Sequence, residues 1–264
     1  MAGVLDRILA AKQGDIAALR ARSLPAPPPL VRPDLRRSPA GTGPLKLIAE
    51  IKRRSPSAGA LSTVLDVPER ARAYERGGAT MISVLCDQTF FDGGFEHLAA
   101  ARAATTLPLL CKDFVLDPVQ LDAARAFGAS AVLLIVRCLG DDALLRLHEG
   151  ALERGLLPIV EVTSEAETER ALRAGARTIG VNARDLDTLE MDRGRAARVL
   201  AGLPDDVTRA WFSGLKDPVD LADPVFSQAD CALIGEGLMR QDDPEPLLRR
   251  FVSAAALSKQ LAAG

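Results

Sequence analysis

Histidine and paired cysteine are scarce in this sequence, and their scarcity excludes several kinds of site. Only His97 and His148 could supply an imidazole, and both fall in segments of helical pattern. A histidine-based metal site or a Ser-His-Asp triad is therefore not expected, and no pattern resembles a flavin or pyridoxal site. The four cysteines show no CxxC spacing and are predicted to be reduced core residues. They are Cys86, Cys111, Cys138 and Cys231.

Long apolar runs and an excess of one charge are also missing. No apolar run approaches the roughly 18 residues of a membrane-spanning helix, and residues 1–25 carry charges scattered through an amphipathic pattern, unlike a signal peptide. We therefore expect a cytoplasmic protein with no membrane partner. The net charge is −2, from 33 basic and 35 acidic residues. The chain therefore lacks the overall positive charge that is typical of nucleic-acid-binding proteins. Any anion must be bound by a local cluster.

The first 44 residues are expected to form an extension that precedes the main domain. Apolar residues at nearly helical spacing predict a helix over residues 4–22. Residues 24–33, LPAPPPLVRP, cannot continue it, because prolines remove donors and force extended backbone. We interpret them as a stiff connector, although low-complexity disorder is an alternative. The length of 264 residues suits one barrel domain over residues 1–264, with the barrel itself in residues 45–264.

A module recurs from residue 45 onward: a polar, helix-like stretch, then Gly-Ala or its equivalent, then an apolar run. Its instances begin at residues 75, 125, 173 and 227. Glycine just past a helix takes the left-handed conformation at little cost, so each instance predicts a helix that ends and a strand that begins. The predicted strands are residues 46–51, 80–85, 108–112, 131–136, 158–162, 178–182, 207–213 and 231–235.

The spacing of these strands predicts the fold class. The starts are about 26 residues apart, which suits a strand, a helix and two loops. Residues 131–136 are apolar without alternation, as in parallel strands covered on both faces. Eight such units that close on themselves make an α/β fold of the (β/α)8 TIM-barrel type, here with an extra N-terminal helix. An open doubly wound sheet is the alternative, but no GxGxxG follows any strand.

Polar residues gather at the ends of the predicted strands, where barrel enzymes build their sites. Each alone fits a solvated strand end, so the informative feature is that they come from several separate strands. They are Glu50 and Lys52, Lys112 with Phe114, Glu161, Asn182 with Arg184, Ser213 with Gly214, and Gly235 with Glu236 and Gly237.

The stretch LKLIAEIKRRSPS, residues 45–57, organises this site. Glu50 and Lys52 are two residues apart on a strand and therefore point to the same face. The loop of residues 53–57 adds cations and hydroxyls, which suits an anionic substrate. A solvated surface ion pair is the alternative for Glu50 and Lys52.

The residue types at these ends suggest two chemical functions. Lys112, near Glu50 and Glu161, could give a proton to a carbonyl or a leaving hydroxyl. The loops at residues 213–214 and 235–237 follow the last two strands, where backbone N–H groups bind phosphate in many barrels. Ordinary helix caps are the alternative for these glycine loops.

Four ordered motifs give the chain a resemblance to a known family. They are IAEIKRRSPSAG (residues 48–59), LLCKDFVLDPVQLDAARAFGASAVLLIV (residues 109–136), IGVNARDLDTL (residues 179–189) and ALIGEGLMRQDDP (residues 232–244). They resemble indole-3-glycerol phosphate synthase, the tryptophan-pathway barrel, over nearly the whole chain. The resemblance implies a carboxy-lyase that converts 1-(2-carboxyphenylamino)-1-deoxyribulose 5-phosphate to indole-3-glycerol phosphate, with loss of carbon dioxide and water and without a cofactor.

The resemblance also implies roles for individual residues. It makes Lys112 a general acid toward the substrate carbonyl and Glu161 a proton-transfer group in dehydration. The residues implied in catalysis are Lys112, Glu161, Glu50, Lys52 and Asn182. Those implied in substrate binding are Ser55, Phe114, Leu133, Arg184, Ser213, Gly214, Gly235 and Glu236.

Two residues depart from the family pattern. Phe212 stands where the family usually has an active-site glutamate, and Glu236 stands where some members have serine. We expect the Glu236 side chain to point away from phosphate. Phe212 leaves two alternatives open: a catalytically altered phosphosugar-binding barrel, or a related enzyme such as phosphoribosylanthranilate isomerase. The expected partner is a small phosphosugar, and the expected state is a monomer or weak homo-oligomer.

Overall fold

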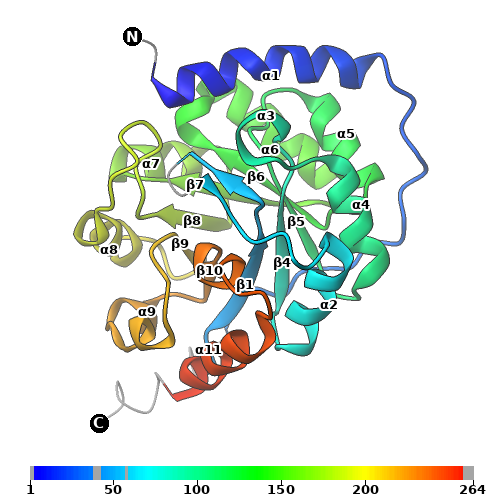
Figure 1. Ribbon diagram of the computed structural model, residues 1–264. Coiled ribbons are helices and arrows are strands. Elements are labelled where there is room, and N and C mark those ends of the chain that lie inside the picture. Colours follow the sequence, from blue (N-terminus) through cyan, green and yellow to red (C-terminus); the bar gives the residue numbers. More distant parts are fainter. Residues whose placement is uncertain (1–2, 38–42, 57–58, 258–264) are drawn as a thin grey trace.

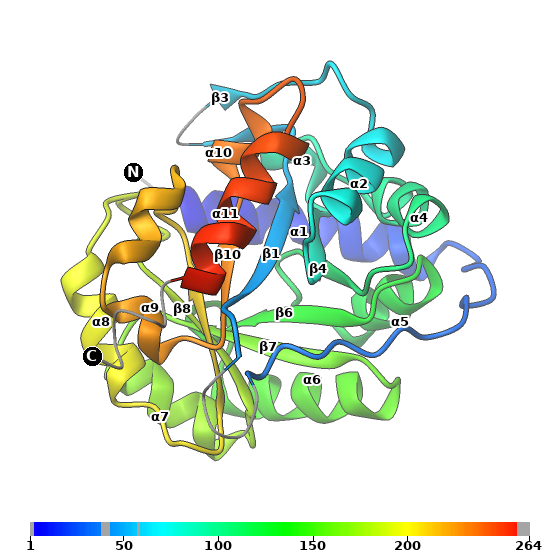
Figure 2. The ribbon, with the colours of Figure 1, turned by 90° about the horizontal axis from the view of Figure 1, so that it is seen from below.

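A closed barrel of parallel strands, surrounded by helices, forms the body of the computed structural model, which describes residues 3–37, 43–56 and 59–257 (Figures 1 and 2). The strand order is β1-β10-β9-β8-β7-β6-β5-β4, and β1 pairs with both β4 and β10 to close the ring. The barrel strands are β1 (Lys46–Ile51), β4 (Met81–Leu85), β5 (Leu109–Lys112), β6 (Ala131–Ile135), β7 (Leu157–Val162), β8 (Thr178–Asn182), β9 (Thr208–Phe212) and β10 (Cys231–Ile234).

Helices connect these strands on the outside of the barrel. The longer ones are α1 (Val4–Arg20), α2 (Val67–Arg76), α4 (Phe95–Ala104), α5 (Pro118–Ala126), α6 (Asp141–Glu153), α7 (Glu165–Arg173), α8 (Arg193–Ala201) and α11 (Glu245–Leu257). The short elements are β2 (Arg54–Ser55), β3 (Gly59–Ala60), α3 (Gln88–Phe91), η1 (Val136–Cys138), η2 (Pro218–Ala222), α9 (Val225–Gln228) and α10 (Glu236–Met239).

The predicted TIM barrel with an extra N-terminal helix is confirmed, and the open sheet is wrong. Each predicted strand agrees with the observed one to within one residue at either end. The N-terminal helix ends at Arg20, two residues earlier than predicted. Ser57, the last residue of the predicted loop after the first strand, lies outside the described residues.

The recurring Gly-Ala module does mark helix ends. Gly78, Gly128 and Gly175 have positive φ angles of 90°, 96° and 87°, and the next strand begins within three residues of each. Proline in the first turn and an aspartate N-cap begin several helices, as at Asp117, whose side chain accepts from the Val119 N–H at 3.0 Å. Local sequence therefore fixes where strands and helices alternate.

Two apolar layers form the core. Side chains that point outward from the strands pack against the helices, and those that point inward fill the barrel. Ile48, Met81 and Ile159 are fully buried inside the barrel. The cysteines are free, with three buried and Cys138 partly buried, as predicted.

Helix α1 lies along one side of the barrel mouth, next to α5 (Figure 1). Its buried Lys12 ammonium contacts Asp113 Oδ1 at 2.7 Å, Asp87 Oδ2 at 2.9 Å and Asp15 Oδ2 at 3.0 Å. Asp87 follows β4 and Asp113 follows β5. One side chain thus fastens the N-terminal helix to two strand ends at the mouth.

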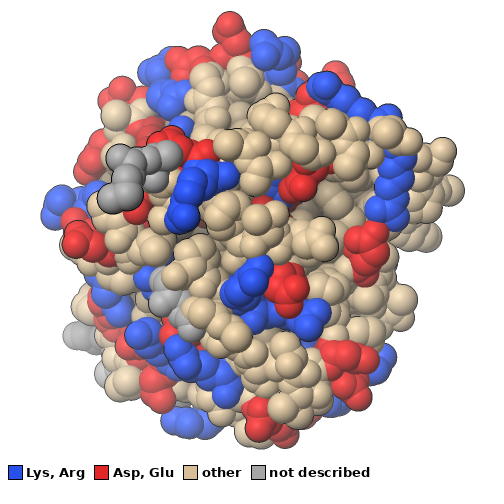
Figure 3. Space-filling view, turned by 45° about the horizontal axis from the view of Figure 1, so that its top comes forward, with Lys and Arg blue, Asp and Glu red and all other residues tan. Residues whose placement is uncertain are grey.

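The connector after α1 has no helix or strand over residues 23–33, as predicted. It leads to the opposite end of the barrel, where the Arg37 backbone N–H donates to Asp230 Oδ1 at 3.0 Å. Among the described residues, no helix is both long and apolar enough to cross a bilayer. Acidic and basic side chains intermingle over the face in Figure 3, in line with the small net charge.

Candidate active site

One pocket, of about 1150 Å³ with its open mouth included, lies at the carboxyl ends of the barrel strands. All the residues that we predicted for catalysis and substrate binding line it, whereas Gly237 does not. The ends of all eight barrel strands contribute to it, because parallel strands of a barrel all end on the same rim. The remaining polar lining residues are Asp113 and Lys216.

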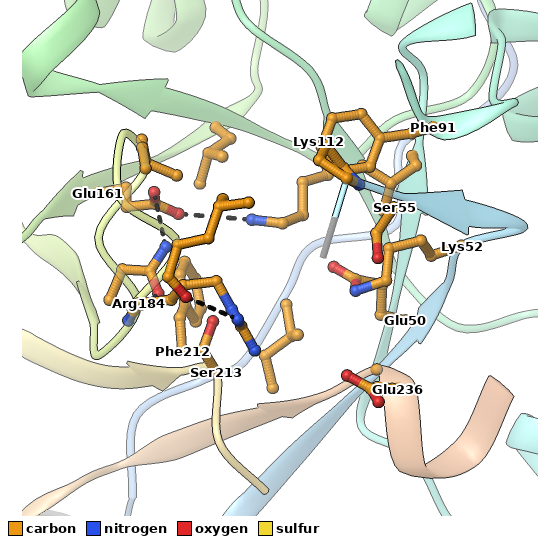
Figure 4. Close-up of a pocket in the computed structure, with 18 of the residues that line it drawn as sticks. Glu50, Lys52, Ser55, Phe91, Lys112, Glu161, Arg184, Phe212, Ser213 and Glu236 are labelled. Carbon is orange, nitrogen blue, oxygen red and sulfur yellow. Dashed lines mark hydrogen bonds and ion pairs between the residues drawn. The ribbon is translucent and has the colours of Figure 1, made fainter. Parts of the chain in front are cut away.

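The most closely connected group joins three neighbouring strands. Lys112 Nζ, at the end of β5, lies 3.4 Å from Glu161 Oε2 on β7, and Asn182 Nδ2 at the end of β8 donates to Glu161 Oε1 at 3.0 Å (Figure 4). The Glu161 side chain is 2% exposed and that of Lys112 is 18% exposed. Two donors fix the orientation of a buried carboxylate, and the ammonium remains accessible from the pocket.

A second charged pair lies across the pocket, with Glu50 on β1 and Lys52 directly after this strand. Lys52 Nζ contacts Glu50 Oε1 at 2.8 Å, and the Glu50 side chain is only 3% exposed. The alternative of a solvated surface pair is therefore wrong. Glu50 Oε2 is buried and has no hydrogen-bond partner among the described residues. A buried acceptor without a donor is costly, so this oxygen requires a donor from a bound ligand or water.

Gly235, after β10, makes room for that pair. A Cβ atom built on Gly235 would lie 2.5 Å from Glu50 Oε1 and 3.4 Å from Lys52 Nζ. No side chain fits there without displacing the carboxylate. The predicted glycine loop therefore has a steric function beside the Glu50 pair.

The loop after β9 offers backbone donors. Ser213 and Gly214 have positive φ angles of 71° and 88°, and the Trp211 Nε1–H donates to the Ser213 carbonyl oxygen at 2.8 Å. The two positive φ angles turn the chain sharply at a strand end where backbone N–H groups bind phosphate in many barrels. Lys216 lies on the same rim and was not predicted from the sequence.

Glu236 turns toward its own helix. Arg240 Nη2 contacts Glu236 Oε1 at 2.8 Å, and this hydrogen bond lowers the pKa of Glu236 below its ordinary value. The carboxylate is therefore charged but neutralised by Arg240, which lessens its repulsion of an anion.

The loop after β8 carries Arg184 and is held by Arg137, which sequence reasoning missed. Arg137 Nη1 lies 2.9 Å from Asp185 Oδ2 and Arg137 Nε lies 3.2 Å from Glu167 Oε1. Burial raises the pKa of Asp185, but backbone N–H donors, chiefly that of Thr188, and Arg137 bring it well below its ordinary value. Arg137 directly follows the fourth predicted strand, residues 131–136, so the rule of polar strand ends could have found it.

Apolar side chains form the other wall of the pocket. Phe114 and Leu133, both predicted, lie there with residues that the sequence did not suggest. They include Val4, Leu5 and Ile8 from α1, Phe91 from α3, and Leu186 and Leu189 from the loop after β8. The pocket thus combines an apolar side suited to a planar ring with a cationic side suited to an anion.

Phe212, at the end of β9, lies next to both Lys112 and Gly180 of β8, and Figure 4 shows it among the residues that line the pocket. Its ring is 1% exposed, and the ring centroid is 5.0 Å from Lys112 Nζ. No carboxylate is present at this position.

Comparison with known proteins agrees with this geometry. A family model described as indole-3-glycerol phosphate synthase matches residues 5–251. The indole-3-glycerol phosphate synthase of Mycobacterium avium is 45% identical over 262 residues, covering 96% of this chain and 95% of that protein. That of Mycobacterium tuberculosis is 43% identical, with the same coverage.

Solved structures with low sequence identity share the fold alone. Thiamine phosphate pyrophosphorylase from Pyrococcus furiosus matches with a TM-score of 0.63 and 16% identity, covering 81% of this chain and 97% of that chain. A 3-hexulose-6-phosphate synthase matches with a TM-score of 0.63 and 14% identity, covering 80% and 99%. The family model and these relatives, which are more than 40% identical to this chain, both cover nearly all of its length. This chain therefore belongs to the indole-3-glycerol phosphate synthase family.

Proposed function

We propose that this protein is an indole-3-glycerol phosphate synthase that closes, decarboxylates and dehydrates 1-(2-carboxyphenylamino)-1-deoxyribulose 5-phosphate in tryptophan biosynthesis. The observation that carries the proposal is the Lys112–Glu161–Asn182 group in the pocket of a chain that belongs to this family. A proton donor beside an ordered carboxylate is what ring closure at a carbonyl, followed by loss of water, requires.

Lys112 acts first in the proposed mechanism. Its accessible ammonium protonates the substrate carbonyl oxygen, so that the carbonyl carbon accepts the electrons of the aniline ring carbon that bears the carboxylate. The new carbon–carbon bond forms, and the carbon–carboxylate bond then breaks to release carbon dioxide. Lys112, after it has been reprotonated by solvent, gives a second proton to the hydroxyl formed from the carbonyl, which leaves as water. Glu161 takes a proton from the methylene carbon next to the ring nitrogen, and this restores the indole. The overall change is loss of one carbon dioxide and one water.

Substrate binding divides between the two walls of the pocket. The phosphate is held by Lys52 and by the backbone donors of Ser213, Gly214 and Gly235. The carboxyphenyl ring lies against Phe114 and Leu133 on the apolar wall, with α1 above it. Arg184 and Ser55 bind the remaining polar groups, and Glu50 accepts from a sugar hydroxyl through its unpartnered oxygen.

The rest of the proposal concerns the working state of the enzyme. A single barrel domain over residues 1–264 catalyses all steps, as a cytoplasmic monomer or weak homo-oligomer, without a cofactor, nucleic acid or membrane.

An ultraviolet assay for the indole product tests this function. The purified protein is mixed with 1-(2-carboxyphenylamino)-1-deoxyribulose 5-phosphate or with phosphoribosylanthranilate. Indole absorbance from the first substrate alone is the expected result. Tight binding of it without carbon dioxide release would instead identify a non-catalytic barrel, and turnover of the second alone would identify an isomerase.

Replacing Gly235 with alanine should lower kcat/KM by about tenfold to a hundredfold, because the added methyl displaces Glu50 from Lys52 and small misplacements in a site are this costly. The steady-state assay above measures it. Gly202→Ala is the matched control, because its Cβ would meet no atom closer than 3.6 Å. Equal kinetics for Gly235→Ala and wild type would show that the Glu50 position does not matter.

A further inference from the structure

Lys112 is held by two unlike groups. Glu161 Oε2 lies 3.4 Å from the ammonium, which is longer than a good charge-assisted hydrogen bond. On another side the Phe212 ring centroid lies 5.0 Å away, within the range of a cation–π interaction. Among the residues that the structure describes, Glu161 is the one carboxylate within ion-pair distance of Lys112. The aromatic face is therefore a main contact of this ammonium.

The Phe212 ring is fixed in position by the strand beside it. A Cβ atom built on Gly180 of β8 would lie 2.4 Å from Phe212 Cε2 and 2.7 Å from Cζ. The ring occupies the space that Gly180 leaves free, and it is 1% exposed. Two residues further along β8, Asn182 holds Glu161 at 3.0 Å. One strand thus supports both contacts of Lys112, the aromatic one through Gly180 and the carboxylate through Asn182.

We propose that Phe212 is a positioning residue for Lys112. Its ring face, placed by Gly180, holds the ammonium in the position from which it donates a proton to the substrate carbonyl. This inference rests on the proposed function of Lys112 as the general acid. A ring attracts a cation through its quadrupole but cannot take a proton from it. Phe212 therefore orients the ammonium and leaves Glu161 as the proton-accepting partner, whereas a carboxylate at this position would compete for the same proton.

Ring fluorination separates this electrostatic function from simple packing. Phenylalanine with one, two or three ring fluorines keeps nearly the same shape but has a progressively weaker negative face. If the ring positions Lys112 through this face, kcat falls stepwise along the series and KM stays within about twofold. A ring that only fills space gives an unchanged kcat.

The experiment incorporates these analogues at residue 212 of the full chain and measures kcat, KM and thermal stability. We expect a total loss in kcat of about threefold to thirtyfold, the range of a cation–π contact in a partly desolvated site. Phe212→Leu should reproduce the largest loss. The same analogues at Phe251, a fully buried phenylalanine of α11 that does not line the pocket, are the control and should leave kcat unchanged. A flat series at residue 212 overturns the proposal, even if Phe212→Leu fails to fold.

A second measurement does not depend on the reaction. Acetic anhydride labels free amines, and mass spectrometry gives the labelling rate of Lys112 relative to that of Lys46 at the far end of the barrel. A weaker ring face should release the Lys112 amine and raise its relative labelling rate along the fluorine series. If the wild type does not make indole-3-glycerol phosphate but this trend appears, the proposed function fails and the Phe212 contact stands. Equal labelling rates along the series would show that the Phe212 ring does not hold the Lys112 amine.

Discussion

Replacing Lys112 with alanine should lower kcat by at least about a hundredfold, the lower range for a positioned general acid. In the proposed mechanism the ammonium is the proton donor toward the substrate carbonyl, and its removal leaves Glu161 with the Asn182 hydrogen bond alone. Binding should change little, because the phosphate contacts proposed for Lys52 and the loops after β9 and β10 stay in place. The measurement is the indole assay at saturating substrate, together with KM.

The matched control for this variant is Lys46→Ala. Lys46 begins β1 at the opposite end of the barrel and pairs with Asp34 at 2.7 Å. Its removal deletes the same number of atoms from a barrel strand without reaching the pocket, so kcat should remain at the wild-type value. Near-normal turnover by Lys112→Ala would discard the general-acid assignment. A large rise in KM with normal kcat would make Lys112 a binding residue only.

Replacing Lys12 with methionine should lower the free energy of unfolding by about 3 to 5 kcal/mol, the usual cost when one partner of a buried ion pair is removed. The Lys12, Asp87 and Asp113 side chains are 2%, 1% and 2% exposed. Burial lowers the pKa of Lys12, but the Asp113 and Asp87 carboxylates raise it by more, so the ammonium stays charged. Without it, two buried carboxylates face each other and α1 loses its attachment. Urea denaturation at pH 7 measures the change.

The stability deficit of Lys12→Met should shrink in acid. Burial already raises the pKa of Asp113 in the native protein, and loss of the facing ammonium acts in the same direction. A raised carboxyl pKa favours the folded state at pH values below the ordinary pKa and costs stability as the pH rises through the folded value. The deficit should therefore be larger at pH 7 than at pH 4.

Two further variants test the reason for that loss. Lys46→Met removes an ammonium from a pair whose Asp34 side chain is 85% exposed, and it should cost no more than about 1 kcal/mol. Adding Asp87→Asn and Asp113→Asn to Lys12→Met should restore part of the stability, because the unpaired charges are then gone. A Lys12→Met protein as stable as the wild type would show that α1 is held by apolar contacts alone.

Much of the barrel follows from local sequence, and this explains why strand limits were predictable. Glycines such as Gly128 and Gly175 end helices through a backbone conformation that does not depend on distant residues. Once the strands are assigned, the barrel places their carboxyl ends on one rim. Glu50, Lys112 and Glu161 were therefore expected together before any distance was known.

Contacts between distant segments could not be predicted in this way. Val4 and Ile8 showed only a helical pattern, and nothing in that pattern indicates that α1 packs against the pocket mouth through Lys12. Phe212 was recognised as a missing carboxylate, but its contact with Lys112 and its place over Gly180 depend on side-chain directions across two strands. Arg137 acts on a loop 48 residues further along the chain.

The pairing of β1 with both β4 and β10 bears on how the protein is made. The barrel closes only when its first strand, β1, pairs with its last strand, β10. The substrate pocket is therefore not complete until the ribosome has released β10, which ends at Ile234. Helix α1 is synthesised first, but its Lys12 cannot form its buried ion pairs until Asp87 and Asp113 have been synthesised and lie close together. A truncated product that stops before residue 231 still contains Lys12, Asp87 and Asp113, but it lacks β10, so its barrel cannot close between β1 and β9.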